Sequence, residues 1–529
     1  MNRRKHKMRG PFVLPRLLHL RLPWKMLMYI AFGVMVLKVI MEVSFYGDRP
    51  WSRDKLGSER RKVSGPRKVR DLEFVAGKFL ETAHPTSNNS YCHERWSFHR
   101  NLMNATGSPE MGTNGPYRVL YDVIRGSVDE GAADLKHKKG SAVGCIGPAA
   151  VTYVTHATPE FLYHIAELLG RWEGPLSVAV FAPGTDAGIA HYALSRLCRC
   201  LLPQQARRLS VHLVYHISHL PVLPESVSDS LDESERSQCG PPAVLGHPTY
   251  RTKMALAYPV NVARNSARSG ARTPHIFVSD VELLPSKGLA TQFCSMLSRA
   301  SRKQDMEGVQ KNWVTDLQIP LKIPLPQPAV SNSGGTRRLA FVVPVFEVEL
   351  GEKVPETKEQ LLALLASDRA FYFHRWQCVH CQKFPGIHLW MEERKSTPGN
   401  LQPLVMVRRE FPYHRWEPIY IGTNREPLYS EVLTWEGKQD KMTQMHQMCL
   451  LGYRFVILDR AFLVHTPGVK RPQPPRSLRG QPVKVEPLDE GAERQKEWVR
   501  SHEKRNTHLY EMIVESMNLA HPRNPRCRS

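Results

Sequence analysis

The sequence predicts an α/β fold with a largely parallel sheet, and three observations support this. Apolar, β-branched runs of strand length recur from residue 149 onward. A helical pattern lies between the first two runs, and strand–helix–strand alternation is typical of parallel sheets. The run at 275–279 ends in two carboxylates, Asp280 and Glu282, and functional side chains of α/β sheets gather at such strand ends.

Seven runs are predicted as strands because they are short and rich in β-branched residues. They are 149–155, 176–182, 211–215, 275–279, 339–345, 404–407 and 455–458. Thr158-Pro159-Glu160 has the composition of a helix start, and the apolar stripe from Phe161 to Trp172 is interpreted as core packing. The Pro-, Ser- and Gly-rich segments 222–250 and 301–337 are predicted surface insertions. Residues 493–517 predict an amphipathic terminal helix.

The chain has 529 residues, which exceeds one ordinary domain, and 41% of them are hydrophobic, which supports a large core. We divide it into five parts. These are a basic tail at 1–25, an apolar segment at 26–45, a charged stem at 46–116, the main domain at 117–470, and an extension with a helix at 471–529.

The segment Met26 to Phe45 is twenty residues long, enough for one membrane-spanning helix. Lys38 and Glu42 interrupt it, but at a spacing of four residues they can pair on one helix face. A cleaved signal peptide is the alternative. We favour an uncleaved anchor because 25 residues precede the run and no small-residue cleavage site follows it.

Glycosylation and cysteine positions orient this anchor. The two sequons, at Asn88 and Asn104, and all ten cysteines lie beyond it. An even number of cysteines suits an oxidising lumen, although their pairing cannot be deduced. We therefore expect a type II protein whose main domain faces the secretory lumen.

The net charge of +23 is spread along the chain. No recognition helix or aromatic-interleaved basic patch accompanies it, so nucleic acid is not an expected partner. Membrane head groups or polyanionic glycans fit the charge better.

The acidic pair carries the first chemical prediction. Side chains alternate along a strand, so positions 280 and 282 point the same way. Two carboxylates presented together can hold a hard divalent cation, and such a cation can hold a diphosphate. We therefore interpret the pair as the metal site of a nucleotide-sugar enzyme. The alternative is that the two carboxylates are only a solvated strand end.

Six motifs in order resemble one enzyme family. They are Arg171-Trp-Glu-Gly-Pro-Leu-Ser-Val-Ala-Val-Phe, Tyr258-Pro-Val-Asn with Arg264-Asn265, Ser279-Asp-Val-Glu-Leu-Leu-Pro-Ser, Val342-Val-Pro-Val-Phe-Glu347, Trp416-Glu-Pro-Ile-Tyr and Phe462-Leu-Val-His465. The series resembles the glucuronyltransferase family that contains β-1,4-glucuronyltransferase and the second catalytic domain of the LARGE xylosyl/glucuronyltransferases. Cys378-Val-His-Cys381-Gln resembles a motif of the first of these.

The resemblance implies a GT-A fold and a manganese-dependent, inverting transferase anchored in the Golgi membrane. It implies transfer of glucuronic acid from its UDP donor to a xylose-ended glycan on a glycoprotein, as in the O-mannosyl glycan of dystroglycan. Transfer of β-1,3-N-acetylglucosamine or of xylose is the enzymatic alternative. Association with other Golgi glycosyltransferases is a further expectation.

Three residues are expected to hold Mn²⁺. Asp280 and Glu282 form the acidic pair, and the resemblance adds His465 as the ligand that completes the shell. Glu282 departs from the family, which carries Asp at this position, so its oxygen is displaced by one methylene.

Donor binding is assigned to Asn261, Arg264 and Asn265. Arg264 lies three residues after Asn261 on one helical face. We interpret it as a contact to the diphosphate or to the sugar carboxylate, with a surface salt bridge as the alternative.

Inversion requires a carboxylate near the acceptor hydroxyl. Glu417 is the first candidate for this general base, and its neighbour Trp416 is expected to offer a stacking face for a sugar. Asp440 is the second candidate. The loop 437–441 differs from the family and is one residue longer, which leaves open a catalytically silent, glycan-binding or complex-forming homologue.

Cys378 and Cys381 are flanked by His374 and His380, but no second ligand pair at regular spacing accompanies them. We therefore predict disulfide bonding rather than zinc, without assigning the partners. Other histidines, such as His156, are interpreted as structural.

Overall fold

A computed structural model describes residues 74–78, 115–126, 150–223, 248–307, 338–392, 400–471, 490–521 and 524–527. The chain divides into two units, and all of these residues belong to the second, Asp71–Ser529. The predicted tail and anchor at 1–45 and both sequons, Asn88 and Asn104, lie outside the described residues. Within the described ranges, no helix combines the length and the apolar character that a membrane span requires.

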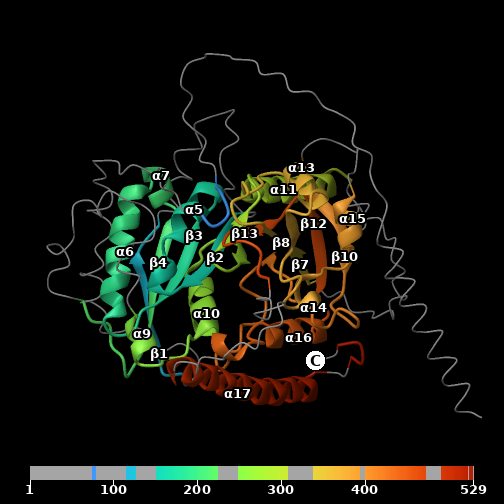
Figure 1. Cartoon of the computed structure of the whole chain (residues 1–529). Coiled ribbons are helices and arrows are strands. Elements are labelled where there is room, and N and C mark those ends of the chain that lie inside the picture. The colour runs from blue at the N-terminus through green and yellow to red at the C-terminus, as the bar shows by residue number, and fades with distance from the viewer. Residues whose placement is uncertain are drawn as a thin grey trace, which may run out of the picture. The chain divides into compact units, whose positions relative to one another are not determined.

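A nine-stranded sheet forms the centre of this unit (Figure 1). Its strand order is β1-β4-β3-β2-β5-β11-β7-β12-β10. The strands are β1 (Tyr117–Ile124), β2 (Val151–Ala157), β3 (Leu176–Phe181), β4 (Leu209–His216), β5 (His275–Val278), β7 (Leu339–Val342), β10 (Gln402–Val407), β11 (Tyr420–Gly422) and β12 (Arg454–Asp459).

A second sheet has four strands in the order β6-β13-β8-β9. They are β6 (Leu283–Pro285), β8 (Val345–Val348), β9 (Ala370–Tyr372) and β13 (Leu463–His465). All seven predicted strands are present. The run predicted at 339–345 is divided between β7 and β8, because Pro344 lacks the N–H that a continuous ladder needs.

The prediction of a largely parallel sheet is correct in part, because four of the eight neighbouring pairs in the nine-stranded sheet are parallel, including β7 with β12. β4, β3, β2 and β5 are parallel neighbours. β1 is antiparallel to β4, β11 is antiparallel to both β5 and β7, and β10 is antiparallel to β12. The sheet is therefore mixed, since strand direction depends on the path of the connections rather than on the residues within each strand.

Helices cover both faces of the parallel half. Helices α5 (His164–Arg171) and α6 (Asp186–Cys200) share one core with Tyr153 and Val178. Helix α10 (Val260–Gly270) shares a second core with the alternating neighbours Val154 and Ala179. Burial on both faces explains why these strands are continuously apolar instead of alternating.

The stripe predicted after Thr158 packs largely as expected. A short 3₁₀ turn, η2 (Pro159–Phe161), precedes α5. Ile165, Leu168, Leu169 and Trp172 are buried, but Phe161 is 42% exposed. The interpretation as core packing is therefore confirmed except at its first residue.

The remaining helical elements surround the second half of the sheet and the edge of the first. They are α7 (Pro203–Ala206), α9 (Tyr250–Lys253), α11 (Leu289–Glu307), α13 (Lys358–Ala366), α14 (Val379–Gln382), α15 (Ile387–Met391), η4 (Trp435–Gly437), α16 (Met442–Leu450) and α17 (Glu490–Ala520).

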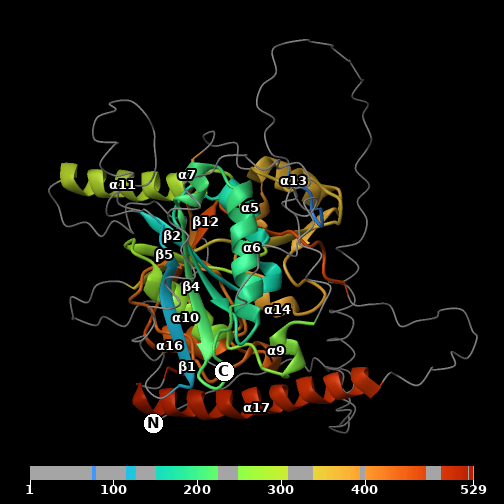
Figure 2. The same ribbon diagram turned by 90° about the vertical axis from the view of Figure 1, so that its left-hand side faces the viewer.

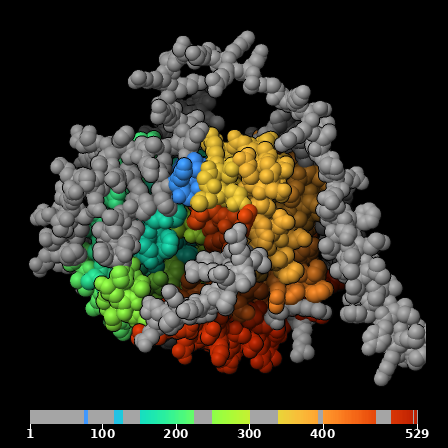
Figure 3. All heavy atoms as spheres, in the orientation of Figure 1, coloured from blue at the N-terminus to red at the C-terminus, as the bar shows by residue number. Residues whose placement is uncertain are grey.

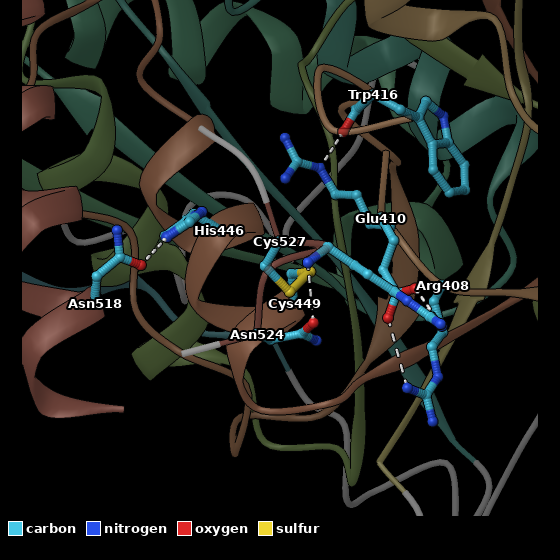
Figure 4. The surroundings of a disulfide bond; sticks show 10 residues. Arg408, Glu410, Trp416, His446, Cys449, Asn518, Asn524 and Cys527 are labelled. Atoms are coloured by element: carbon cyan, nitrogen blue, oxygen red, sulfur yellow. Dashed lines mark hydrogen bonds and ion pairs between the residues drawn. A yellow bond between two sulfur atoms is a disulfide. The ribbon is translucent and has the colours of Figure 1, made fainter. Parts of the chain in front are cut away.

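The long helix α17 contains the terminal helix predicted at 493–517. It runs along the lower side of the unit in two perpendicular views and packs on η4 and α16 (Figures 1 and 2). A disulfide between Cys449 of α16 and Cys527 ties the segment after α17 to the domain. Figure 4 shows this disulfide together with the nearby hydrogen bond between His446 and Asn518, 2.9 Å long.

Residues 74–78, which the sequence assigns to the stem, belong to the folded unit. Phe74 is 5% exposed and Ala76 is fully buried. The backbone N–H of Ala76 donates to the carbonyl of Glu352 at 2.8 Å, and that of Val354 donates to Phe74 at 2.7 Å. The packed domain therefore includes residues upstream of 117.

Candidate active site

A cleft with a volume of about 1380 Å³ lies beside the turn between β5 and β6. Figure 3 shows the segments that surround it, with the earlier ones in green and cyan, those after residue 338 in yellow and orange, and α17 in red along the lower edge. Four predicted site residues line the cleft, namely Asp280, Glu282, Glu417 and Asp440. Side chains far apart in the sequence therefore meet at the carboxyl end of β5.

The turn that presents the acidic pair is fixed by a buried tyrosine. The backbone N–H of Leu283 donates to the carbonyl of Asp280 at 3.2 Å and closes the turn. The hydroxyl of Tyr153, on the neighbouring strand β2, donates to the carbonyls of Leu283 at 2.8 Å and of Asp280 at 3.2 Å. Both carboxylates are thereby presented to the cleft from a rigid backbone.

Three nitrogen groups surround the carboxylate of Asp280. The Nζ of Lys441 lies 3.2 Å from one of its oxygens, and the other lies 3.3 Å from Arg264 and 3.4 Å from His156. Burial alone raises the pKa of Asp280, but Lys441, His156 and Arg264 together hold the pKa well below its usual range. Asp280 is therefore a fixed negative charge.

Arg264 links the acidic pair to the divergent loop. Its side chain is 1% exposed and forms an ion pair with Asp440 as well as with Asp280. Burial alone lowers the pKa of Arg264, but Asp440 and Asp280 raise it above its usual value. The predicted surface salt bridge is thus a buried one, and a contact to the donor remains a prediction.

Asn261 and Asn265 do not point to an open donor site. The Nδ2 of Asn261 donates to the backbone carbonyls of Ser430 at 2.7 Å and Asp440 at 2.8 Å. The Nδ2 of Asn265 donates to the carbonyl of Tyr429 at 2.9 Å, and its Oδ1 accepts from the N–H of Tyr429. Both side chains are buried and hold the segment 429–440 against α10, and their assignment to donor binding stays a prediction.

Glu282 and His465 lie in contact, as predicted for two ligands of one metal. The Nε2 of His465 lies 3.1 Å from the Oε1 of Glu282, and Lys470 lies 3.5 Å from the same oxygen. Burial alone raises the pKa of Glu282, but His465 and Lys470 lower it to about 2. Glu282 is therefore ionised at any physiological pH.

The chemistry of this pair fits a divalent cation. The Nδ1–H of His465 donates to the carbonyl of Gly468 at 2.8 Å, which directs Nε2 to the carboxylate, where it holds either a proton or a cation. Metal-binding histidines are held by backbone carbonyls in this way. Within the described ranges, no three His, Cys, Asp or Glu side chains form a ready metal cluster, and both oxygens of Asp280 face Lys441 or Arg264.

Glu417 lines the same cleft. Its pKa is raised to about 7, chiefly by burial and to a smaller extent by Asp440, while the positive charge of Lys441 opposes the shift. A general base is most effective when its pKa lies near the working pH. Of the two predicted bases, Glu417 has this property, whereas the carboxylate of Asp440 is held by Arg264.

The backbone of Glu417 is held by the Cys-x-x-Cys-Gln motif. Its N–H donates to the carbonyl of Cys381 at 2.8 Å, and its carbonyl accepts from the Nε2 of Gln382 at 3.0 Å. Cys378 and Cys381 form a disulfide with each other, so the prediction of disulfide bonding is confirmed and the pairing is settled. Cys198, Cys200 and Cys294 are also disulfide-bonded.

Trp416 belongs to the core rather than to the cleft. It is 1% exposed and packs edge-on against Phe455, with ring centroids 5.7 Å apart. Its carbonyl accepts a 2.6 Å hydrogen bond from Arg409 (Figure 4). The prediction that Trp416 stacks on a sugar is therefore wrong, because its ring faces are covered by the fold.

Sequence reasoning missed two residues at the acidic pair. Lys441 lies in the loop 437–441, and a positive charge in this loop could have indicated a contact with the acidic pair. His156 contacts Asp280 through one ring nitrogen and the hydroxyl of Tyr258, at 2.7 Å, through the other. No local spacing distinguishes such a histidine from a structural one.

The carboxylates that follow β5, the half-buried Glu417 and the cleft fit a glycosyltransferase of the GT-A class. A family model described as "Glycosyl-transferase for dystroglycan" matches residues 150–484. The chain belongs to this family of glycosyltransferases, and the resemblance drawn from its motifs is confirmed.

Individual relatives agree with this assignment. The chain is 28% identical to beta-1,4-glucuronyltransferase 1 of Danio rerio over 367 residues, which cover 66% of this chain and 72% of the relative. The chain is 27% identical to the human enzyme of the same name over 410 residues, which cover 76% of this chain and 83% of that enzyme. The human xylosyl- and glucuronyltransferase LARGE2 is 25% identical over 327 residues, covering 60% of this chain and 33% of that protein.

Proposed function

We propose that this glycosyltransferase is an inverting, manganese-dependent enzyme that transfers glucuronic acid from UDP-glucuronic acid to a xylose-ended glycan. The observation that carries the proposal is the position of Glu417, whose pKa is raised to about 7, in the same cleft as Asp280 and Glu282. A base for the acceptor and charged groups for the donor thus share one space. Two named relatives with glucuronyltransferase activity support the donor.

In this mechanism Glu417 accepts the proton of the acceptor hydroxyl. The acceptor oxygen forms a bond to the anomeric carbon while the bond from that carbon to the diphosphate oxygen breaks. UDP leaves from the opposite side, and the configuration inverts. The raised pKa of Glu417 matters because a carboxylate of ordinary pKa is a weaker base.

Glu282 and His465 would hold Mn²⁺, with Asp280 as the third predicted ligand. When bound, the ion would neutralise charge that develops on the leaving diphosphate. Lys441 and Arg264 already place positive charge at Asp280 and would orient an anionic donor beside it.

The proposal includes the cellular setting predicted from the sequence. A type II protein anchored through residues 26–45 in the Golgi membrane would meet UDP-sugars and glycoprotein acceptors in the lumen. Association with other Golgi glycosyltransferases remains part of this proposal. Detection of the full-length chain by its C-terminus on the lumenal side of Golgi membranes would test the placement.

A donor screen on the purified full-length chain tests the enzymatic proposal. UDP-glucuronic acid, UDP-xylose and UDP-N-acetylglucosamine are each offered with xylobiose as a xylose-ended acceptor, in Mn²⁺ or in EDTA. We expect transfer from UDP-glucuronic acid alone and its loss in EDTA. A preference for another donor would replace the donor in the proposal but keep the reaction class.

One observation favours a catalytically silent, glycan-binding alternative. Both oxygens of Asp280 already face positive groups of the chain, Lys441 and Arg264, instead of an open coordination site. Hydrolysis of the UDP-sugars without acceptor separates the two alternatives. Absence of both hydrolysis and transfer with all three donors would favour the silent protein.

A further inference from the structure

Tryptophan side chains from three separate segments line the cleft that contains Glu417. They are Trp376, which follows β9, Trp435 at the start of η4, and Trp498 on α17. Trp435 is 51% exposed and Trp376 is 37% exposed, and Trp498 is half-buried. Large apolar side chains that share a cleft and remain open to water mark a binding surface.

Each of the three tryptophans has a contact that anchors its side chain or its backbone. The ring of Trp376 lies 4.6 Å from that of Phe371, and Arg471 lies 5.3 Å from the Trp376 centroid. The backbone N–H of Trp435 donates to the carbonyl of Tyr258 at 3.2 Å. The ring of Trp498 lies 4.2 Å from that of His502. The rings of Trp376 and Trp498 are therefore positioned by neighbouring side chains, which lowers the entropic cost of binding.

Helix α17 and the loop before α16 are coupled by one buried side chain. Asn506 of α17 is 1% exposed, and its Nδ2 donates to the carbonyls of Thr434 at 2.8 Å and Lys438 at 2.9 Å. A side chain added at Gly437 would collide with Asn506, so the two segments pack tightly. Trp435 and Trp498 thus belong to one connected structure.

The charges in the cleft favour a neutral ligand beside these rings. Arg251 pairs with Glu436 at 3.1 Å, and Lys438 pairs with Glu503. Lys441 and Lys470 pair with the acidic residues at β5. These four cations are therefore already paired, and the C–H face of a neutral sugar ring suits the electron-rich face of an indole. Trp376 already contacts two guanidinium groups, since Arg375 and Arg471 lie 5.4 Å and 5.3 Å from its ring centroid.

We propose that Trp376, Trp435 and Trp498 form the binding surface for the acceptor sugar. Helix α17, which lies beyond the matched residues 150–484, would then supply part of the acceptor site. This inference rests on the proposed function for the identity of the sugar. It replaces the stacking role expected of the buried Trp416.

The test compares W435A and W498A with the full-length parent chain. F411A is the matched control, because Phe411 is 57% exposed and does not line the cleft. We expect NMR saturation transfer from the protein to xylobiose, without donor, to fall in both tryptophan variants and to persist in F411A. We also expect the acceptor KM to rise about 2- to 10-fold per tryptophan, a larger change than that in kcat.

W498F separates stacking from scaffolding, because phenylalanine keeps a ring face and should retain most of the binding. Three outcomes would overturn the inference. Saturation transfer to xylobiose is unchanged in both alanine variants, falls equally in F411A, or is absent with the parent chain. If no UDP-sugar is turned over but saturation transfer depends on the tryptophans, the proposed function fails and this surface stands. Turnover with an unchanged acceptor KM in both alanine variants would instead leave the proposed function standing and overturn the tryptophan surface.

Discussion

At the scale of single residues, Glu417 has the two properties that a general base in glycosyl transfer needs. It lines the cleft, and burial raises its pKa to about 7. The base must be deprotonated to accept the acceptor proton, so the active fraction grows as the pH rises through the pKa. Activity should therefore increase between about pH 6 and pH 8 instead of being constant there.

The substitution E417Q removes the base but keeps the shape of the side chain. We expect kcat to fall by about 10²- to 10⁴-fold and the rise with pH near 7 to disappear. The matched control is E410Q, since Glu410 lies on the same segment, faces Arg408 and Arg526, and is absent from the cleft lining (Figure 4). An intact pH profile in E417Q would assign the base to another residue.

The contact between Glu282 and His465 makes a metal role of this pair testable. We expect E282Q to weaken Mn²⁺ binding by more than about tenfold, measured by electron paramagnetic resonance of bound Mn²⁺.

E282D keeps a carboxylate and should preserve or raise activity, whereas D280A should abolish metal-dependent turnover. E349Q, at a surface carboxylate paired with Arg471, is the control and should bind Mn²⁺ normally.

At the scale of elements, the Cys-x-x-Cys-Gln segment acts on the site through Glu417. The disulfide between Cys378 and Cys381 shapes the segment, and Gln382, 5% exposed, donates to the carbonyl of Glu417. Gln382 is therefore a positioning residue, because its side chain bonds to the backbone that carries the base and not to the base itself.

We expect Q382A to lower kcat about tenfold, because misplacement of a catalytic group by about 1 Å can cost up to a hundredfold. It should also reduce the free energy of unfolding by about 1–3 kcal/mol, since a buried carbonyl loses its donor. The control is Q360A, which removes a helix-capping contact at α13, far from the cleft lining. Steady-state kinetics measure kcat, and chemical denaturation measures the free energy of unfolding, in both variants. Equal kinetic losses in the two variants would contradict a positioning role.

At the scale of the whole molecule, the C-terminal region is an integral part of the packed domain. Helix α17 packs on η4 and α16, and Cys527 is bonded to Cys449 across 78 residues. The backbone carbonyl of Arg526 also accepts from the N–H of Phe411 at 3.1 Å. Stability and acceptor binding are therefore expected to depend on the same terminal segment.

Replacing Cys449 and Cys527 together by serine should lower the free energy of unfolding by about 2–4 kcal/mol, because a long loop is no longer closed. The contrasting variant replaces Cys378 and Cys381, which are three residues apart and should contribute less to global stability. Thermal unfolding of the oxidised proteins measures the loss of stability in each double variant. A larger loss from the short loop would contradict the entropic argument.

The sequence by itself determined the local features of this protein. Runs of β-branched residues predicted the strands, because burial on both faces leaves a continuous apolar pattern. Asp280 and Glu282 both line the cleft, as the sequence predicted, but they lie in the turn between β5 and β6 instead of on a strand. Six motifs in order were enough to recognise the family.

Only the tertiary structure decided which residues meet. Trp416 and Trp435 look equally suitable in the sequence, but one is 1% and the other 51% exposed. Asn261 and Asn265 bond to a loop far along the chain. The physical reason is that residue spacing reports burial within one element, whereas partners, strand direction and exposure depend on how distant elements pack.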